Sequence, residues 1–283
     1  QITLYSPPRG FHKVPWRGVE ISEDNLLFKG FINSSLHVNC ETFANFQESK
    51  WDRDVLQFYQ EWIPQVGYNS IIDCLANART LESSQLHRLG SILVDYHMQH
   101  KEKNITPKHL IEVNSRNVLN HAPLHGVVWQ LIETRGLETS NRREFFEQLC
   151  WYQNEDQMGD VWISCVHGIG HAIGDLLGYE RRTEALNLCE TVDDWDWKYS
   201  CATGVFMVLY KDSRWGNLSK WLPCTESQFP ASCFRFKDSH LYTGNYPCDD
   251  LSDSYHHRGC VWGHAFQLKR FYRVEQAGEF CAR

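Results

Sequence analysis

The sequence has 283 residues, of which 42% are hydrophobic and 13% aromatic, so it is long enough for one large domain or two small ones with a substantial core. Its net charge of −7 is spread along the chain and its pI is near 6.1, which argues against a phosphate-binding surface and therefore against nucleic acid as a partner. No stretch approaches the roughly 20 apolar residues of a membrane helix, so no transmembrane segment is expected.

Cysteine is abundant and unevenly placed. Cys40 and Cys74 lie alone in the first half, and the other nine of the eleven cysteines lie between Cys150 and Cys281. Close C-x-x-C pairs, which a cysteine metal site needs, are absent from the sequence. This pattern predicts disulfides formed in an oxidising compartment, with a connectivity that the spacing leaves open. Because the number is odd, at least one cysteine is free, paired to another chain or paired outside this sequence, and a disulfide-linked or non-covalent oligomer is among the expectations.

Other features favour the same compartment. Sequons begin at Asn33, Asn104 and Asn217, as in a secreted glycoprotein. Gln1 is compatible with removal of a signal peptide. The expected location is therefore extracellular or in the lumen of the secretory pathway.

Taken in chain order, residues 1–50 predict an irregular N-terminal arm or cap, because prolines and glycines interrupt short apolar pieces. Residues 51–283 predict a single helical-repeat domain. Apolar residues recur every three to four positions from Asp52 to Ile63 and again from Leu86 to Tyr96. Thr106-Pro107 then predicts a helix start, since a capping hydroxyl precedes a proline at the first helical position.

The next part of the chain repeats one frame, in which a glycine follows a variable residue and opens an apolar helix. The frame occurs at 124–129 (LHGVVW), 166–171 (VHGIGH), 202–207 (ATGVFM) and 261–266 (VWGHAF). In the last three copies a cysteine stands three residues before the glycine; these cysteines are Cys165, Cys201 and Cys260. The steps between copies are 42, 36 and 59 residues, and candidate partner helices lie at 143–152 and 183–189.

These patterns predict a mainly α fold of stacked antiparallel helix pairs, either an α-solenoid or an α/α toroid, stapled by disulfides. Proline, glycine, asparagine and aspartate are dense from Trp215 to Asp253, so the C-terminal part is expected to be rich in long disulfide-held loops.

The most distinctive segment is Cys165-Val-His-Gly-Ile-Gly-His171. Residues four apart lie on one face of a helix, so His167, His171 and Asp175 are predicted to form a single column. Two imidazoles at this spacing can share a metal ion, and a carboxylate one turn further on can bind it or act as a base. Gly168 and Gly170 are each costly inside a helix and therefore indicate a close neighbour on that face.

A second column is predicted at His121, His125 and Glu133, with Pro123 disturbing the start of its helix. The two helices could face one another across a mononuclear or dinuclear site. Nitrogen and oxygen ligands of this kind suit zinc, iron, manganese or copper, so the expected cofactor is a transition metal ion of open identity.

Further histidines have weaker patterns. His264 is a candidate ligand in the last copy of the frame, although Trp262 replaces the residue equivalent to His167 there and suggests that this copy keeps a packing role. His87 could point inward and complete the site, or be a solvated histidine. The acidic and aromatic run from Asp193 to Trp197 is interpreted as an exposed loop held by its rings.

Together, His125-Gly126, CVHGIGH at 165–171, ALNLC at 185–189 and CATGVFM at 201–207 resemble a loosely defined, uncharacterised family of exported helical proteins. Its members carry C-x-H-G-x-G-H, then A-L-x-x-C, then C-x-x-G-x-F-M, and the resemblance covers residues 85–265. It implies an exported repeat protein that keeps these histidines, and it names no reaction. Members often have an acid shortly after the first His-Gly; Gln130 stands there in this chain, so Glu133 would have to replace it.

The leading hypothesis is a secreted metal-dependent enzyme, either a hydrolase or an oxygenase-type oxidoreductase, acting on an unidentified small-molecule or extracellular substrate. His125, His167 and His171, together with His121 and His264, are its candidate ligands, and Asp175 and Glu133 are its candidate catalytic acids or bases. The competing hypothesis is a non-catalytic extracellular structural or binding glycoprotein, in which the histidines are hydrogen-bonded interior residues. A metal carrier that turns nothing over is the third.

Overall fold

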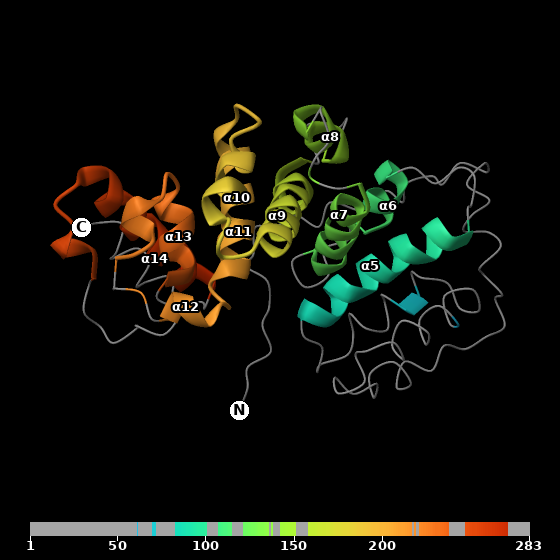
Figure 1. The fold of residues 1–283 in the computed structure, drawn as a ribbon, viewed down its shortest axis with the longest axis horizontal. Helices are drawn as coiled ribbons and strands as arrows, with labels where there is room; N and C mark the ends of the chain where they lie inside the picture. Colours follow the sequence, from blue (N-terminus) through green and yellow to red (C-terminus); the bar gives the residue numbers. More distant parts are fainter. Residues whose placement is uncertain are drawn as a thin grey trace, which may run out of the picture.

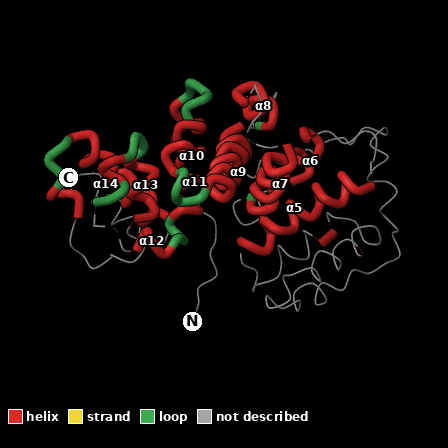
Figure 2. Tube along the Cα trace, viewed as in Figure 1, coloured by secondary structure: helices red, strands yellow, loops and turns green. Residues whose placement is uncertain are grey.

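A computed structural model of the chain describes residues 61, 70–71, 83–100, 107–114, 121–135, 137, 142–150, 158–216, 218, 221–237 and 247–270. In this part of the chain every regular element is a helix, as the sequence predicts (Figure 2). The predicted N-terminal arm and the helix expected to begin at Asp52 lie outside it, apart from the helical residue Glu61. The three sequon asparagines also lie outside it.

The α-helices follow one another along the chain with short connections, and two 3-10 turns separate the last ones. Their bounds are α5 Ser83–His100, α6 Pro107–Asn114, α7 Ala122–Arg135, α8 Arg142–Leu149, α9 Met158–Leu177, α10 Arg182–Cys189, α11 Trp195–Leu209, α12 Ser213–Gly216, η3 Cys224–Glu226, α13 Pro230–Lys237, η4 Pro247–Asp250 and α14 Ser254–Arg270. The helices predicted around Leu86–Tyr96, after Pro107 and near 143–152 and 183–189 are confirmed.

The long helices form one row in space. In Figure 1, α5 and α7 lie at one end, α9 is central, and α11, α13 and α14 follow toward the other end. Each helix in this order packs against the next, while the short α6, α8 and α10 connect them at the side. The row buries a continuous apolar core that includes Leu93, Ile132, Ile173 and Phe206. The mainly helical, disulfide-stapled fold that the sequence predicts is confirmed, and its long helices stack side by side in this row.

Two of the helix crossings are made by reciprocal pairs of glycines. A Cβ atom on Gly170 would lie 1.9 Å from the backbone oxygen of Cys201, and one on Gly204 would lie 2.1 Å from that of His167. The crossing of α5 and α7 has the same form: a Cβ on Gly90 or Gly126 would lie within 2.0 Å of a backbone oxygen of the other helix. Any side chain would force these backbones apart, so glycine is required for the close approach.

Helices α9 and α11 run in the same direction. Gly170 lies against Cys201 and Gly204, and one turn later Gly174 lies against Val205 and Val208. The copies of the repeated frame in α9 and α11 are therefore parallel neighbours, and the short helix α10 joins them. The sequence anticipates antiparallel pairs but not this parallel relation between successive copies.

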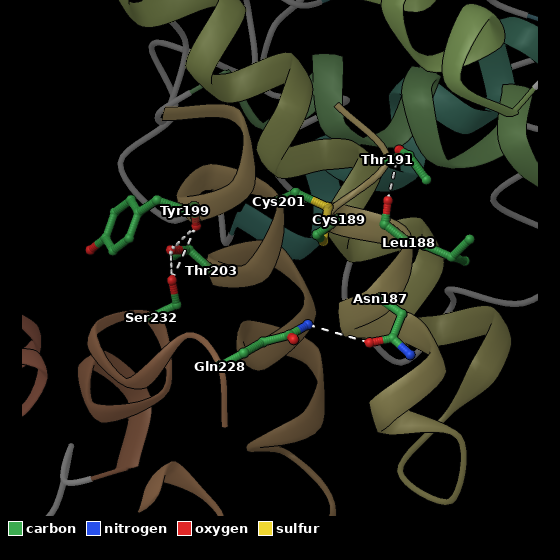
Figure 3. Close-up of a disulfide and its surroundings, with 9 residues drawn as sticks. All are labelled: Asn187, Leu188, Cys189, Thr191, Tyr199, Cys201, Thr203, Gln228 and Ser232. Atoms are coloured by element: carbon green, nitrogen blue, oxygen red, sulfur yellow. Dashed lines mark hydrogen bonds between the residues drawn. A yellow bond between two sulfur atoms is a disulfide. The ribbon is translucent and has the colours of Figure 1, made fainter. Parts of the chain in front are cut away.

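Four disulfides staple the described part of the chain. They join Cys150 to Cys165, Cys189 to Cys201, Cys224 to Cys233 and Cys248 to Cys260. In each, the second cysteine lies in a helix and the first lies 9 to 15 residues upstream, so each bond fixes a helix to the segment that leads into it. Figure 3 shows the Cys189–Cys201 bond between α10 and α11.

Two local predictions need correction. The C-terminal part is less dominated by loops than expected, because α13 lies within the stretch from Trp215 to Asp253 and is anchored by the Cys224–Cys233 bond. The segment from Asp193 to Trp197 is not simply a loop, since the Asp194 carboxylate accepts a hydrogen bond from the Trp197 backbone at 2.8 Å and starts α11 there.

Among the described helices, none combines the length and the apolar character that crossing a membrane requires.

Candidate metal centre

Four histidine rings meet at the centre of the helix row. They are His87 on α5, His125 on α7, and His167 and His171 on α9. The ring centroids of His167 and His171 are 4.7 Å apart, and those of His87 and His125 are 5.0 Å apart. The His125 centroid lies 5.2 Å from that of His167. The His171 centroid lies 5.4 Å from those of both His87 and His125. The sequence predicts three of these residues as ligands.

The glycine crossings explain why the rings can meet. His87 and Gly90 lie one turn apart on α5, and the backbone oxygen of His87 is the atom that faces Gly126 of α7. On the other side, Gly168 of α9 lies against the backbone and ring of His125. Since small residues bring α5, α7 and α9 within backbone contact, the histidines of three helices fall within one cluster.

Two of the imidazoles have a nitrogen with no hydrogen-bond partner among the described residues. The Nε2 atoms of His125 and His171 are both buried, and the two residues are 8% and 6% exposed. The other nitrogen of His125, Nδ1, lies 3.1 Å from His87 Nε2, so one of the two rings donates a hydrogen bond to the other. A buried nitrogen without a partner costs about 1–3 kcal/mol, and a ligand at that position would remove the cost.

The surroundings of the cluster favour neutral imidazoles. Burial lowers the pKa of His125 well below its usual range, and the nearby rings of His171 and His87 lower it further. Burial likewise lowers the pKa of His171 and of His167. For His87, burial and the positive charge of Lys211 lower the pKa to about 4. Neutral imidazole is the form that binds a metal ion.

The backbone of Ser200 on α11 supports one of these rings, because a hydrogen bond with it opposes the lowering of the pKa of His167. An imidazole that binds a metal through one nitrogen usually donates the other N–H to such a group, which fixes its orientation. The cluster therefore contains part of the supporting shell that metal ligands require.

The ring spacing fits a common ion, but the nitrogens are not converged. Imidazoles that bind one ion at about 2.1 Å have ring centroids about 4.5–5.3 Å apart, depending on the angle between the ligands. The observed distances of 4.7–5.4 Å cover nearly the same range. However, no three of these four rings offer nitrogens that all lie within 4.8 Å of one another. Binding would therefore require rotation of ring planes within the cluster.

His264, another candidate ligand, lies elsewhere. It is buried on α14, with its ring centroid 6.4 Å from that of Phe234. Among the described residues, the one group whose ligand atoms all lie within 4.8 Å of one another is Cys248, Cys260 and His264. Because the two sulfur atoms are bonded to each other, they are not free to bind an ion there.

The second predicted column is incomplete. Helix α7 begins at Ala122, and His121 precedes it with a φ of 59°, so His121 and His125 do not share a helical face as predicted. His121 is buried and close enough to His125 to lower the pKa of that imidazole, but it does not line the cavity beside the histidines. Glu133 is exposed, and its position two turns beyond His125 puts it about 12 Å further along α7.

Asp175 follows His171 by one turn on α9, as predicted, but its side chain is exposed. Partial desolvation raises the pKa of Asp175, while Lys211 and the Trp129 side chain act in the opposite direction. Neither Asp175 nor Glu133 lines the cavity beside the histidines. The structure therefore brings His125, His167 and His171 together, and it leaves both predicted acids at the surface.

The sequence pattern selects His87 less clearly than the other three histidines of the cluster. A signal is present, because His87-x-x-Gly90 has the same spacing as His167-x-x-Gly170, and in both the glycine makes the helix crossing. Periodicity alone does not reveal it, since His87 lies beside Leu86 and Leu89 at the edge of the apolar face. The side chains of His97 and His100, further along α5, lie outside the described part of the structure.

A cavity of about 930 Å³ opens next to the cluster. His87, His125 and His167 form part of its wall, and the rest comes from α9, α11, α13 and α14. Beside it, Thr203 donates a 2.7 Å hydrogen bond to the Tyr199 carbonyl and lies 3.2 Å from the Ser232 hydroxyl, which links α11 to α13 (Figure 3). The volume is at the upper end of the range for small-molecule sites.

No family model, curated protein or solved structure matches the chain.

Proposed function

We propose that the protein is a metal-dependent enzyme of an oxidising compartment, with a transition metal ion bound by His87, His125, His167 and His171. The observation that carries this proposal is the meeting of four imidazoles from three helices, two of them with a buried nitrogen that lacks a partner, at the wall of a large cavity. The four disulfides support the compartment.

The donor set indicates the kind of ion. Four neutral nitrogen ligands suit zinc, copper, iron or nickel better than calcium or magnesium, which prefer oxygen. When bound, the ion would supply Lewis acidity at the cavity wall. Three of the histidines reach that wall, whereas His171 lies behind it in contact with all three, so a substrate in the cavity would approach the ion from the side of α11.

The four histidines would hold the ion in the same way for a hydrolytic or for an oxidative reaction. Neither exposed acid lines the cavity, so neither is assigned the role of a base. Among the described residues, the titratable side chains that line the cavity beyond the histidines are Asp196, Tyr199, Arg235, Tyr255 and Arg258. Burial raises the pKa of Tyr199, so its hydroxyl stays protonated and can donate a hydrogen bond to a bound substrate.

Metal analysis of protein purified without chelator or a histidine tag, and then loaded separately with zinc, copper, iron and nickel, tests the proposal. We expect about one equivalent per chain for at least one metal, and less than about 0.1 equivalent in the His167→Ala/His171→Ala variant. His264→Ala is the matched control, because it removes one buried imidazole from a similar helix. A wild-type content below about 0.1 equivalent with every metal would contradict the proposal.

Enzymatic activity needs its own test. Metal-loaded protein is assayed for hydrolysis of activated esters and amides, and for consumption of dioxygen with a reductant. We expect turnover that disappears in the same double variant while the melting temperature of the metal-free protein changes little. A structural role for the histidines would instead be supported if the double variant unfolds and the wild-type protein shows neither bound metal nor turnover.

A further inference from the structure

Exposed apolar side chains gather at the cavity. Of the six large hydrophobic side chains that are exposed among the described residues, four line the cavity, and we call these four its rim. They come from three helices: Ile163 from α9, Trp195 from α11, and Tyr255 and Trp262 from α14. Single exposed apolar residues are ordinary, but a cluster of them around one cavity marks a surface that binds an apolar partner.

The apolar surface continues along the cavity wall. The lining residues include four further apolar side chains that are buried or half-buried, namely Met207, Phe229, Pro230 and Ala231. A ligand with apolar surface would exchange contact with water for contact with these side chains and with the rim, which is favourable.

The hydroxyl groups of the wall already make hydrogen bonds within the protein. Thr203 and Ser232 both donate to the Tyr199 carbonyl, at 2.7 and 3.2 Å (Figure 3). The Tyr255 hydroxyl donates a 2.7 Å hydrogen bond to the Gln228 carbonyl, which also holds the Tyr255 ring in place at the rim. These hydroxyl groups therefore do not require a polar ligand to satisfy them.

The charged side chains of the wall are either bonded within the protein or solvated. Arg235 hydrogen-bonds to the Tyr199 side chain, and Arg258 donates a 3.2 Å hydrogen bond to the Ser254 carbonyl. Asp196 and Arg258 are exposed, so water screens their opposite charges. The wall therefore gives no strong preference to an ionic ligand of either sign.

From these features we propose that the cavity binds an uncharged, largely apolar organic molecule, held by contacts with the rim and with the apolar wall. Such a molecule would be the substrate class of the proposed enzyme, and this catalytic meaning rests on the proposed function. The binding itself requires only the cavity and the side chains that line it.

N-phenyl-1-naphthylamine is the probe, because it is uncharged and fluoresces more strongly in apolar surroundings. The matched probe is 1-anilinonaphthalene-8-sulfonate, which has the same ring system and one added negative charge. In titrations followed by fluorescence, we expect saturable binding of the uncharged probe and binding of the sulfonate that is at least about tenfold weaker. Equal or tighter binding of the sulfonate, or no saturable binding of the uncharged probe, would overturn the inference.

Two matched variants of α9 locate the bound probe. Ile163 is 44% exposed and lines the cavity, whereas Leu176 is 37% exposed and does not line it. Ile163→Glu is expected to weaken binding of the uncharged probe about tenfold or more, because the new carboxylate would lose water beside the probe. Leu176→Glu is expected to change the affinity by less than about twofold, and both variants should keep a native melting curve because both side chains are exposed.

Trp195→Ala tests the rim on a second helix without adding a charge, and it should weaken binding of the uncharged probe several-fold. An unchanged affinity in both Ile163→Glu and Trp195→Ala, with the variants folded, would contradict the placement of the ligand. An equal loss of affinity in Leu176→Glu would contradict it as well.

Titration of the uncharged probe in the presence of chelator separates this inference from the proposed function. Binding of the probe by a wild-type protein that takes up no metal would support the ligand cavity and contradict the metal centre. Metal binding without probe binding would do the reverse. Because His171 does not line the cavity, His171→Ala should lose metal affinity and retain its affinity for the probe.

Discussion

Helices α9 and α14 both carry a cysteine three residues before a glycine, and both cysteines are bonded to a partner upstream, at separations of 15 and 12 residues. Both glycines lie against the neighbouring helix, Gly168 against His125 of α7 and Gly263 against the backbone of α13. The two helices differ at the residue before the glycine. In α9 it is His167, inside the cluster, and in α14 it is Trp262, exposed at the rim of the same cavity.

One structural unit thus serves two chemical purposes. The disulfide and the glycine fix the path of the helix, and the position before the glycine is directed toward the cavity in both copies. A histidine at that position contributes to the candidate metal centre, whereas a tryptophan contributes to the apolar opening. The sequence-based expectation that the α14 copy keeps only a packing role is therefore too narrow for Trp262.

The largest effect is expected at the glycine of each helix whose added Cβ atom would come closest to the backbone of a neighbouring helix. These are Gly170 in α9 and Gly263 in α14, and Gly170→Ala and Gly263→Ala should each destabilise the fold by about 3 kcal/mol, because the added methyl group would meet backbone atoms that cannot move independently. Gly174→Ala is the control in α9, since its nearest contact is the Val208 side chain at 3.2 Å. Chemical denaturation measures the difference, and equal stability of all three variants would refute the requirement for glycine at the crossings.

Removal of either disulfide should cost a similar amount of stability, because the closed loops are of similar length. We expect about 3 kcal/mol for Cys150→Ala/Cys165→Ala and for Cys248→Ala/Cys260→Ala. Only removal of the Cys150–Cys165 bond should also weaken metal binding, since Cys165 lies two residues before His167. Metal titrations of both variants check this, and equal metal affinities would show that the α9 staple does not position the histidine.

The metal-free protein should lose stability as the pH falls below about 6.5, the pKa of histidine in an unfolded chain. The folded-state pKa of His87 is about 4 and those of His125 and His171 are also lowered, so between these values the unfolded chain binds more protons than the folded one. Each histidine adds up to about 1.4 kcal/mol per pH unit to the slope.

Thermal melts between pH 7 and pH 5 in the presence of chelator measure this slope. His87→Gln should reduce it without reversing its sign. A melting temperature that stays constant over this interval in the wild type would contradict the burial of neutral imidazoles.

The smallest effect is expected at the two acids that the sequence offers as catalytic groups. Glu133→Gln and Asp175→Asn should change metal affinity by less than about threefold, because both side chains are exposed and neither lines the cavity. Isothermal titration with the preferred metal checks the values. A loss of more than about tenfold in Asp175→Asn would place that carboxylate in the centre after all.

Much of this architecture can be predicted from the sequence because it depends on local rules. The periodicity around Leu89 and Tyr96, the proline at the start of α6 and the repeated glycine frame correctly indicate helices and their order. His125, His167 and His171 can be selected because their spacing is a property of a single helix.

The features that the sequence does not reveal depend on contacts between segments that are distant along the chain. His87 joins the cluster only because Gly90 and Gly126 bring α5 and α7 into backbone contact, which no local pattern encodes. His121 leaves the predicted column because its positive φ sets it outside the helix. Arg235 lies near His167 through the packing of α13 on α11, although 68 residues separate the two in the sequence.

X-ray absorption spectroscopy of the metal-loaded protein most directly tests whether the ion is bound by the four histidines. The method distinguishes the histidine cluster of α5, α7 and α9 from the Cys248, Cys260 and His264 group by the atoms that each offers to an ion. A centre at α5, α7 and α9 predicts three or four nitrogen neighbours at about 2.0–2.1 Å with the outer-shell scattering of imidazole, and no sulfur. Sulfur neighbours at about 2.3 Å would instead place the ion at Cys248, Cys260 and His264 after reduction of their disulfide. That result would contradict the four-histidine centre.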